Sequence, residues 1–358
     1  MRVPVVVVTG VDPDPMAATV VGLQFDLPAA VAVRHHIDVE RQVLTRTVSD
    51  VSGVLEHVET TLEHACISCA IREDIVPTVE RLARLRRWQS VLVHLPVGAE
   101  AYNLCSALNW DTRLARLLRV SAVVTAVRAG TVVDDLTGEA LLAERGHHCA
   151  RDDRRGVGEV LAAMVEYADA VVCDGVPSTP ARGLLRVLAR PQGVVFAEGT
   201  HELDAAPLVD RLHVHARSDA WSSPVREGDL PRLGPETEGA WRVDLRSSRA
   251  FHPERLLESL EVLGGGAHRS RGCFWIPTRP GRVLEWDGAG GQLSIGDWGT
   301  WHGRTRLTRI VLAGVGVAPA RLADAFESLL VRPGEQDGRW CTVEDGFEPW
   351  LGPIEEVA

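Results

Sequence analysis

The first 216 residues alternate apolar runs typical of β-strands with amphipathic helical stretches, and this alternation most limits the possible folds. An apolar run at 3–8 leads into Thr9 and Gly10, and a helix with one apolar stripe is predicted at 72–88. Apolar strands separated by helices favour a mostly parallel sheet with helices on both faces. Further strands are predicted at 30–37, 41–49, 90–96, 122–127, 170–173 and 193–197, and further helices at 102–118, 157–167 and 182–188.

The character of the chain changes after residue 216. Residues 217–240 lack periodicity and are rich in Pro, Gly, Ser and charge, which predicts a linker. Beyond it the order of predicted elements is strand, helix, three strands, strand and helix, which favours a small split βαβ layer. We therefore predict an α/β domain at 1–216, a linker at 217–240 and a smaller α+β domain at 241–358.

All 38 basic residues are arginine, and the chain contains no lysine. This excludes Schiff-base chemistry, a lysine general base and the lysine of a phosphate-binding loop. The net charge of −11 and a pI near 5.6 argue against direct, sequence-specific nucleic-acid binding. We find no membrane-length apolar run and no features of a signal peptide, and seven cysteines suit a reducing compartment. We therefore expect a cytoplasmic protein without a membrane partner.

The loop after the first strand resembles a phosphate-binding loop only at its beginning. Laid over the pattern G-x-x-x-x-G-K-[ST], Gly10 matches, whereas Pro15, Met16 and Ala17 replace the second glycine, the lysine and the hydroxyl. Proline lacks an N–H, methionine cannot neutralise phosphate, and alanine cannot hold Mg²⁺. Taken alone, one matching glycine is weak evidence: Gly10 fits an ordinary strand-loop-helix turn as well as a vestigial phosphate-loop position.

Cys66 and Cys69 form a C-x-x-C turn just before the helix predicted at 72–88. Two cysteines at this spacing can supply half of a tetrahedral zinc site, with His64 or Glu63 as further candidate ligands. A redox disulfide and plain structural cysteines remain alternatives at this point.

Other cysteines and histidines carry weaker signals. Cys105, Cys173 and Cys273 fit buried small apolar residues. The His-His-Cys sequence at 147–149 could bind a soft metal, but a surface loop is favoured. His35 and His36 face opposite sides of a strand, so structural roles are favoured for both.

Several motifs together resemble the CobW branch of the CobW/HypB/UreG family of metal-handling P-loop GTPases. The family block Cys-x-Cys-Cys-Thr-[IV]-Arg-x-Asp corresponds here to residues 66–74, with Ser68 in place of the middle cysteine. The segments 249–256 (RAFHPERL) and 269–276 (RSRGCFWI), with Trp298 and Trp301, resemble the CobW C-terminal domain. The resemblance covers nearly the whole chain and implies a P-loop-NTPase-like fold.

Three family motifs for nucleotide binding are degenerate in this sequence. Besides the loop at Gly10, the Glu-Thr-Thr-Gly segment is replaced by residues 94–98, His-Leu-Pro-Val-Gly. Cys173 and Asp174 stand where the guanine-reading Asn and Lys belong. The family activity is GTP hydrolysis, but these losses predict that GTP is an unlikely cofactor and that the chain is not an active GTPase.

A narrower resemblance concerns CobW-like proteins that recruit a ribosome hibernation factor. The Cys-[VI]-Ser-Cys form of the cysteine block, the Val-His-Leu segment at 93–95 and the eroded phosphate loop are similar to these proteins. The resemblance implies a zinc-homeostasis adaptor whose partners are a hibernation-promoting factor and the ribosome, with zinc as a possible cofactor at Cys66 and Cys69. The alternative is a GTP-dependent zinc metallochaperone.

Overall fold

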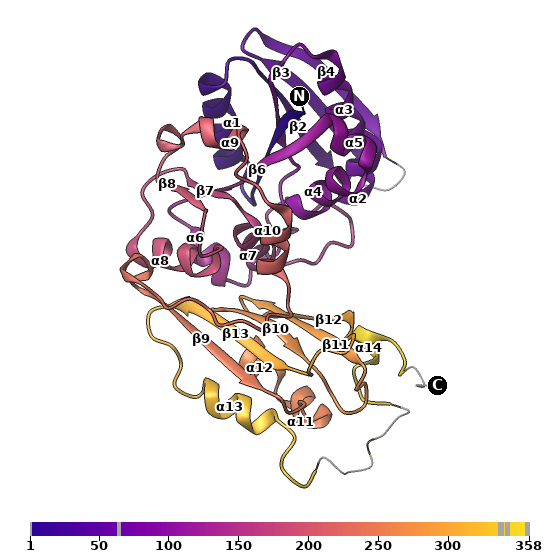
Figure 1. The fold of residues 1–358 in the computed structure, drawn as a ribbon, viewed down its shortest axis with the longest axis vertical. Helices are drawn as coiled ribbons and strands as arrows, with labels where there is room; N and C mark the ends of the chain where they lie inside the picture. Colours follow the sequence, from indigo (N-terminus) through magenta and orange to yellow (C-terminus); the bar gives the residue numbers. More distant parts are fainter. Residues whose placement is uncertain (1, 63–65, 336–339, 341–343, 355–358) are drawn as a thin grey trace.

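The computed structural model describes residues 2–62, 66–335, 340 and 344–354 (Figure 1). Its larger part is an eight-stranded sheet. Six neighbouring strands run parallel to one another, and the remaining two, β3 and β4, extend one edge of the sheet through antiparallel pairing. The predicted mostly parallel α/β sheet is confirmed. The strand order is β4 (Gly53–Thr61), β3 (Val43–Asp50), β2 (Ala30–Asp38), β5 (Ser90–His94), β1 (Val3–Thr9), β6 (Leu118–Val127), β7 (Ala170–Cys173) and β8 (Val195–Ala197).

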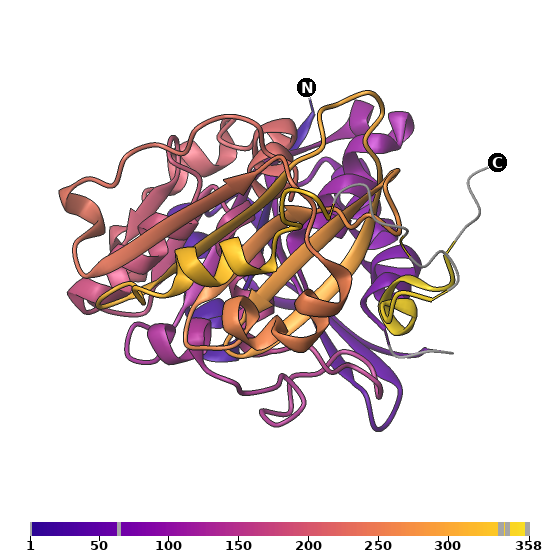
Figure 2. The same cartoon turned by 90° about the horizontal axis from the view of Figure 1, so that it is seen from below.

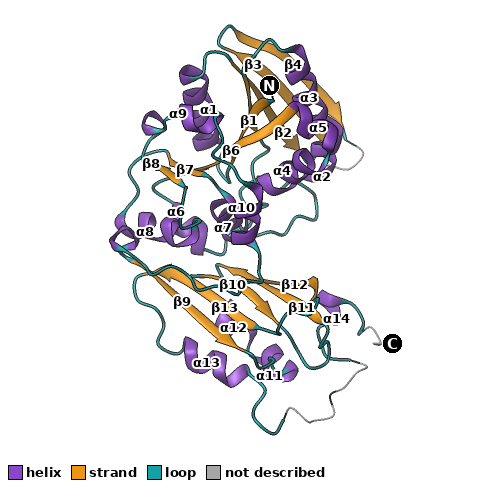
Figure 3. Ribbon diagram, viewed as in Figure 1, coloured by secondary structure: helices purple, strands orange, loops and turns teal. Residues whose placement is uncertain are grey.

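Helices cover both faces of this sheet, as expected for strands that are apolar on both sides (Figure 3). One face packs against α3 (Val76–Leu85), α4 (Ala101–Trp110) and α5 (Thr112–Leu117), and the other against α1 (Pro13–Asp26) and α9 (Ala205–Val209). A third apolar cluster forms around β7. The helices of this cluster are α6 (Val132–Thr137), α7 (Val157–Tyr167) and α8 (Thr179–Leu188).

The C-terminal part is a five-stranded antiparallel sheet. In the order β12 (Gln292–Thr300), β11 (Arg282–Ala289), β10 (Arg269–Phe274), β13 (Thr308–Val315) and β9 (Ala240–Ser247), β13 lies between β9 and β10, which makes the predicted split βαβ arrangement. Its outer face packs on three helices, as Figure 2 shows from below. These are α11 (Pro253–Glu258), α12 (Leu260–Gly264) and α13 (Leu322–Leu329), and α14 (Glu348–Leu351) follows near the end.

Three sequence-based expectations differ from the structure. The predicted linker begins inside a helix, because α10 (His215–Ser222) extends into residues 217–222. The helix predicted at 102–118 is two helices, since the Asp111 carboxylate accepts the N–H groups of Arg113 and Leu114 and so caps α5. Strand β4 was not predicted, because its side chains are largely exposed and carry no burial pattern.

Among the described residues, no helix is long and apolar enough to cross a membrane.

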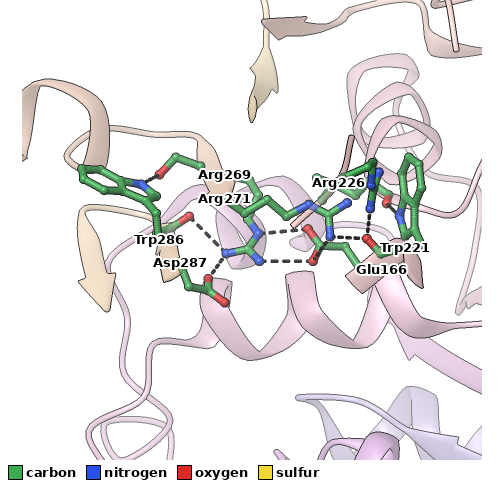
Figure 4. Close-up of polar contacts among 10 residues, drawn as sticks. Glu166, Trp221, Arg226, Arg269, Arg271, Trp286 and Asp287 are labelled. Atoms are coloured by element: carbon green, nitrogen blue, oxygen red, sulfur yellow. Dashed lines mark hydrogen bonds and ion pairs between the residues drawn. The ribbon is translucent and has the colours of Figure 1, made fainter. Parts of the chain in front are cut away.

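The inner face of the second sheet packs on α7 and α8. A buried carboxylate of α7 lies at this contact between the helices and the sheet (Figure 4). Glu166 of α7 is 2 % exposed and binds the guanidinium of Arg269 through two hydrogen bonds of 3.0 and 3.1 Å. Arg271 donates to the same carboxylate at 3.0 Å and to the Trp221 carbonyl at 3.0 Å. Arg269 also pairs with Asp287 of β11. The interface is thus held by a charged network in which the partners are satisfied.

The two parts also meet at close backbone range. Gly290, with a φ of 56°, lies so near the chain at Gly138 that a Cβ would approach the Gly138 carbonyl oxygen to 1.9 Å. Only glycine fits this contact.

Replacing Glu166 by Gln should lower the free energy of unfolding by about 3 kcal/mol, because Arg269 and Arg271 then lose a buried counter-charge. Urea denaturation measures this loss. The exposed Glu40, which forms no ion pair with a described residue, provides the matched control, and Glu40→Gln should change stability by less than about 0.5 kcal/mol.

The same variant has an expected pH dependence. Burial alone would raise the pKa of Glu166, but the charges of Arg269 and Arg271 lower it below the usual glutamate value. The stability difference between wild type and Glu166→Gln should therefore be complete above about pH 4.3 and shrink as the pH falls through the lower folded pKa. A difference that grows on acidification would contradict the assigned network.

Candidate functional site

The candidate site lies at the carboxyl edge of the larger sheet, where ligands of open parallel sheets bind. Strands β1, β2, β5, β6 and β7 all end at this edge, and the chain leaves β1 through Gly10 to enter α1 at Pro13. In a phosphate-binding loop, the first N–H groups of such a helix would bind the phosphates.

In this chain the N-terminus of α1 is closed by its own residues. Asp12 is the N-cap and its carboxylate accepts the Asp14 N–H at 3.0 Å. The residues on either side of Asp14, Pro13 and Pro15, have no N–H to donate. Each of the first three helical residues therefore either has no N–H group or has its N–H group bonded to a carboxylate.

Arg128, which follows β6, bridges this cap to the neighbouring strands. Its Nε and Nη2 donate to the Asp12 carboxylate at 2.5 and 2.9 Å, and Nη2 also reaches Asp14 at 2.8 Å. Its Nη1 lies 3.6 Å from a carboxylate oxygen of Asp174, which follows β7. The other Asp174 oxygen accepts the Ala129 N–H at 2.7 Å. One guanidinium thus contacts three carboxylates and links the ends of β1, β6 and β7.

These contacts hold Asp12 in its charged form. Burial acts to raise the pKa of Asp12, but the hydrogen bonds from Arg128 and from the Asp14 N–H lower it below the ordinary value. The positive end of the α1 dipole favours the same charged form.

Gly10 has a packing role that accounts for it without a phosphate. A Cβ at Gly10 would lie 2.7 Å from the Ala126 carbonyl oxygen and 2.9 Å from the Met16 Cγ. Met16, at the position of the family lysine, has no exposed surface and packs beneath the loop.

The end of β5 carries a neutral histidine instead of a carboxylate. His94 is 2 % exposed, its Nδ1 lies 2.8 Å from the Leu95 carbonyl oxygen, and burial lowers its pKa to about 4. The following segment is held down by Thr9, whose hydroxyl donates to the Ala99 carbonyl at 2.5 Å. This segment supplies no anionic group that could hold Mg²⁺.

Cys66 and Cys69 lie on one turn at the same edge of the sheet, because β4 ends beside the start of β3 and the end of β2. Cys66 is the N-cap of α2 (Ile67–Ala70), and its Sγ accepts the Cys69 N–H at 3.2 Å. Both side chains are partly buried, and the neighbouring Cys66 raises the pKa of the Cys69 thiol. The two sulfur atoms are therefore close enough to serve as ligands of one soft metal ion.

The rest of a zinc site is not assembled in the described part of the chain. There, no three His, Cys, Asp or Glu side chains form a metal-binding group. The further candidate ligands His64 and Glu63 lie outside the described residues.

The cysteine turn is anchored to the sheet by Asp74, the last residue of the motif. A π-helical turn at Ile71–Ile75 joins α2 to α3 and carries Asp74 inward. Its carboxylate binds His35 at 2.9 Å, Arg46 at 2.5 Å and Thr78 at 3.3 Å. The predicted structural role of His35 is confirmed, since this buried ring holds the anchor.

The remaining cysteine predictions have mixed outcomes. Cys105, Cys173 and Cys273 are buried as predicted, at 0, 3 and 0 % exposure. Cys149 is also buried, with its Sγ 3.2 Å from the Val97 carbonyl oxygen, so the favoured surface-loop interpretation of 147–149 is wrong at this residue.

Comparison with known proteins agrees with these features. Residues 241–330 match the family model described as the cobalamin synthesis protein cobW C-terminal domain. A zinc chaperone of Mycobacterium tuberculosis is 32 % identical, over 98 % of this chain and 94 % of that protein. This chain belongs to the CobW family.

Two further similarities are more distant. The zinc-regulated GTPase metalloprotein activator 1 of Dictyostelium discoideum is 24 % identical, over 72 % of this chain and 57 % of that protein. The crystal structure of the Zn(II)-bound YjiA GTPase from E. coli covers 92 % of this chain and 100 % of its own, with 13 % identity and a TM-score of 0.37.

In this CobW-family chain, the structure brings Gly10, Asp12 and Asp174 together at one site, with Cys66 and Cys69 on a separate turn of the same edge. Sequence reasoning recognised Asp174 as a departure from the family but missed Arg128. The available signal was an arginine directly after an apolar strand, at the carboxyl edge of a parallel sheet.

Asp12 and Asp14 allow the cap to be tested with matched variants. Asp12→Ala should lower the free energy of unfolding by about 2 kcal/mol, because α1 loses its cap and Arg128 loses its closest partner. Asp14→Ala removes a more exposed contact to Arg128 but leaves the cap, and should cost less than about 1 kcal/mol. Equal losses in urea denaturation would contradict the assigned cap.

Proposed function

We propose that this protein acts in zinc homeostasis as a protein-binding adaptor that recruits a hibernation factor to ribosomes under zinc limitation, without hydrolysing GTP. The observation that carries the proposal is the closure of the α1 N-terminus by Asp12 and Arg128. A chain that fills this position with its own carboxylate has little use for a nucleotide phosphate there, and is better suited to act by binding another protein.

The zinc part of the proposal is supported by Cys66 and Cys69 and by the names of two relatives. These two thiols share one turn, and thiolates are preferred zinc ligands. The M. tuberculosis relative is named a zinc chaperone, and the D. discoideum relative a zinc-regulated GTPase metalloprotein activator. In the proposed function, Cys66 and Cys69 bind zinc when the ion is available and are free when it is scarce.

A GTP-dependent zinc metallochaperone is the second candidate, favoured by the word GTPase in the name of the D. discoideum relative. The two candidates differ at the N-terminus of α1, where Pro13, Pro15 and Met16 oppose phosphate and Mg²⁺ binding. Calorimetry with GTP and Mg²⁺ distinguishes them. No saturable binding at micromolar nucleotide supports the adaptor, and a saturable isotherm with Mg²⁺-dependent turnover supports the metallochaperone.

The metal hypothesis is tested at the cysteine turn itself. A Cys66→Ser, Cys69→Ser double variant should lose at least one equivalent of bound zinc, because hydroxyl oxygens replace both thiolates. Equilibrium dialysis with elemental analysis measures the stoichiometry. Ser68 is exposed between the two cysteines, so Ser68→Ala is the matched control and should bind as much zinc as the wild type. Undiminished zinc in the double variant would refute the assignment.

The adaptor role predicts association that depends on zinc supply. The tagged full-length protein, isolated from zinc-depleted cells, should co-purify with ribosomes and a small hibernation factor, and the yield should fall several-fold when zinc is restored. Quantitative mass spectrometry of the eluates measures both partners. Equal recovery in both conditions, or no ribosomal protein in either, would overturn the proposed function.

A further inference from the structure

A cavity of about 700 Å³ lies at the opposite edge of the larger sheet from the site described above. It opens where β1, β2 and β5 begin, and its apolar lining includes Leu27, Trp88 and Leu117. Its volume is in the range of sites that bind small molecules.

The rim of this cavity carries unbalanced positive charge. Three arginines, Arg2, Arg86 and Arg119, line it together with a single carboxylate, Asp26. None of the three arginines forms an ion pair within the described part of the chain. Acidic residues outnumber arginines in this chain, which has a net charge of −11. A shortage of carboxylates therefore does not explain why these three arginines have no ion pair.

Arg119 is the most constrained of these arginines. Its Nη2 donates to the Val209 carbonyl at 2.8 Å, whereas its Nη1 is buried and has no hydrogen-bond partner among the described residues. Burial lowers the pKa of Arg119, and the charges of Arg211 and Arg2 lower it further, whereas the charge of Asp210 acts in the opposite direction. The described residues thus leave this guanidinium with unused donor capacity and no ion-pair partner beside the cavity, which favours an anion as its ligand.

A second cavity points to the same group. It has a volume of about 320 Å³, is also lined by Arg2 and Arg119, and adds Arg211. Arg119 therefore lies between an apolar cavity on one side and a more basic one on the other.

We propose that this edge of the sheet binds a small amphipathic anion. Its carboxylate or phosphate head group is held by Arg119 and Arg2, and its apolar body lies against Leu27, Trp88 and Leu117 in the larger cavity. The guanidinium fork matches both head groups, and burial of the apolar body adds to the binding free energy. This site is separate from the cysteine turn and from the α1 cap, and does not depend on the function proposed above.

The test is calorimetry on the full-length protein with three probes of equal chain length: decanoate, decyl phosphate and decanol, each below its micellar or solubility limit. We expect one saturable site for at least one of the two anions and at least tenfold weaker binding of decanol. The preferred anion identifies the head group. Failure of both anions to bind, or equal binding of decanol, overturns the proposal.

Two variants locate the site. Arg119→Gln should weaken binding of the preferred anion about tenfold, the amount expected for one charge-assisted hydrogen bond. Arg86→Gln, at an exposed residue whose loss leaves the packing intact, should weaken it by a smaller factor. Arg304→Gln removes an exposed arginine of the loop between β12 and β13 and should leave binding unchanged. Wild-type affinity in Arg119→Gln would overturn the proposal, with circular dichroism confirming that each variant is folded.

Discussion

The bidentate pairing of Glu166 with Arg269 is the interaction on which the relation between the two sheets depends. The carboxylate is buried on α7, so its charge requires a partner that reaches it from β10. The same two-point geometry recurs where Arg309 binds Asp244 and where Arg279 binds Asp345. Arginine presents a planar fork that lysine lacks, so a chain with only arginine can use directional ion pairs at its buried contacts.

The Arg128 contacts have a different character, because they join strand ends within one sheet. Asp12 bonds both to the first turn of α1 and to Arg128, so the helix cap and the ends of β6 and β7 form a single unit. Asp74 does the equivalent for the cysteine turn, holding the motif helix against β2 and β3. The carboxyl edge of this sheet is therefore organised by carboxylates of the chain itself.

The accuracy of the sequence-based predictions depended on the kind of pattern on which each was based. Apolar runs such as 3–8 and 170–173 predicted their strands within a residue or two, because burial on both faces leaves a continuous pattern. Strand β4 carried no such pattern, and the break at Asp111 depended on a local cap within a region of helical composition.

For the site, the departures from the phosphate-loop pattern at Pro15 and Met16 could be identified directly from the sequence. The partner of Asp12 could not, because Arg128 lies 116 positions away and only the strand order brings it near.

The two prolines in the first turn of α1 limit what a single substitution could do at this loop. A single Met16→Lys substitution would put an ammonium group where the side chain has no exposed surface, next to a loop that still lacks two N–H donors. Matching the phosphate-loop pattern would require changes at Pro15, Met16 and Ala17 together, and the Asp12–Arg128 contact would still close the N-terminus of the helix. A sequence with this helix cap is therefore several simultaneous substitutions away from the family pattern at this loop.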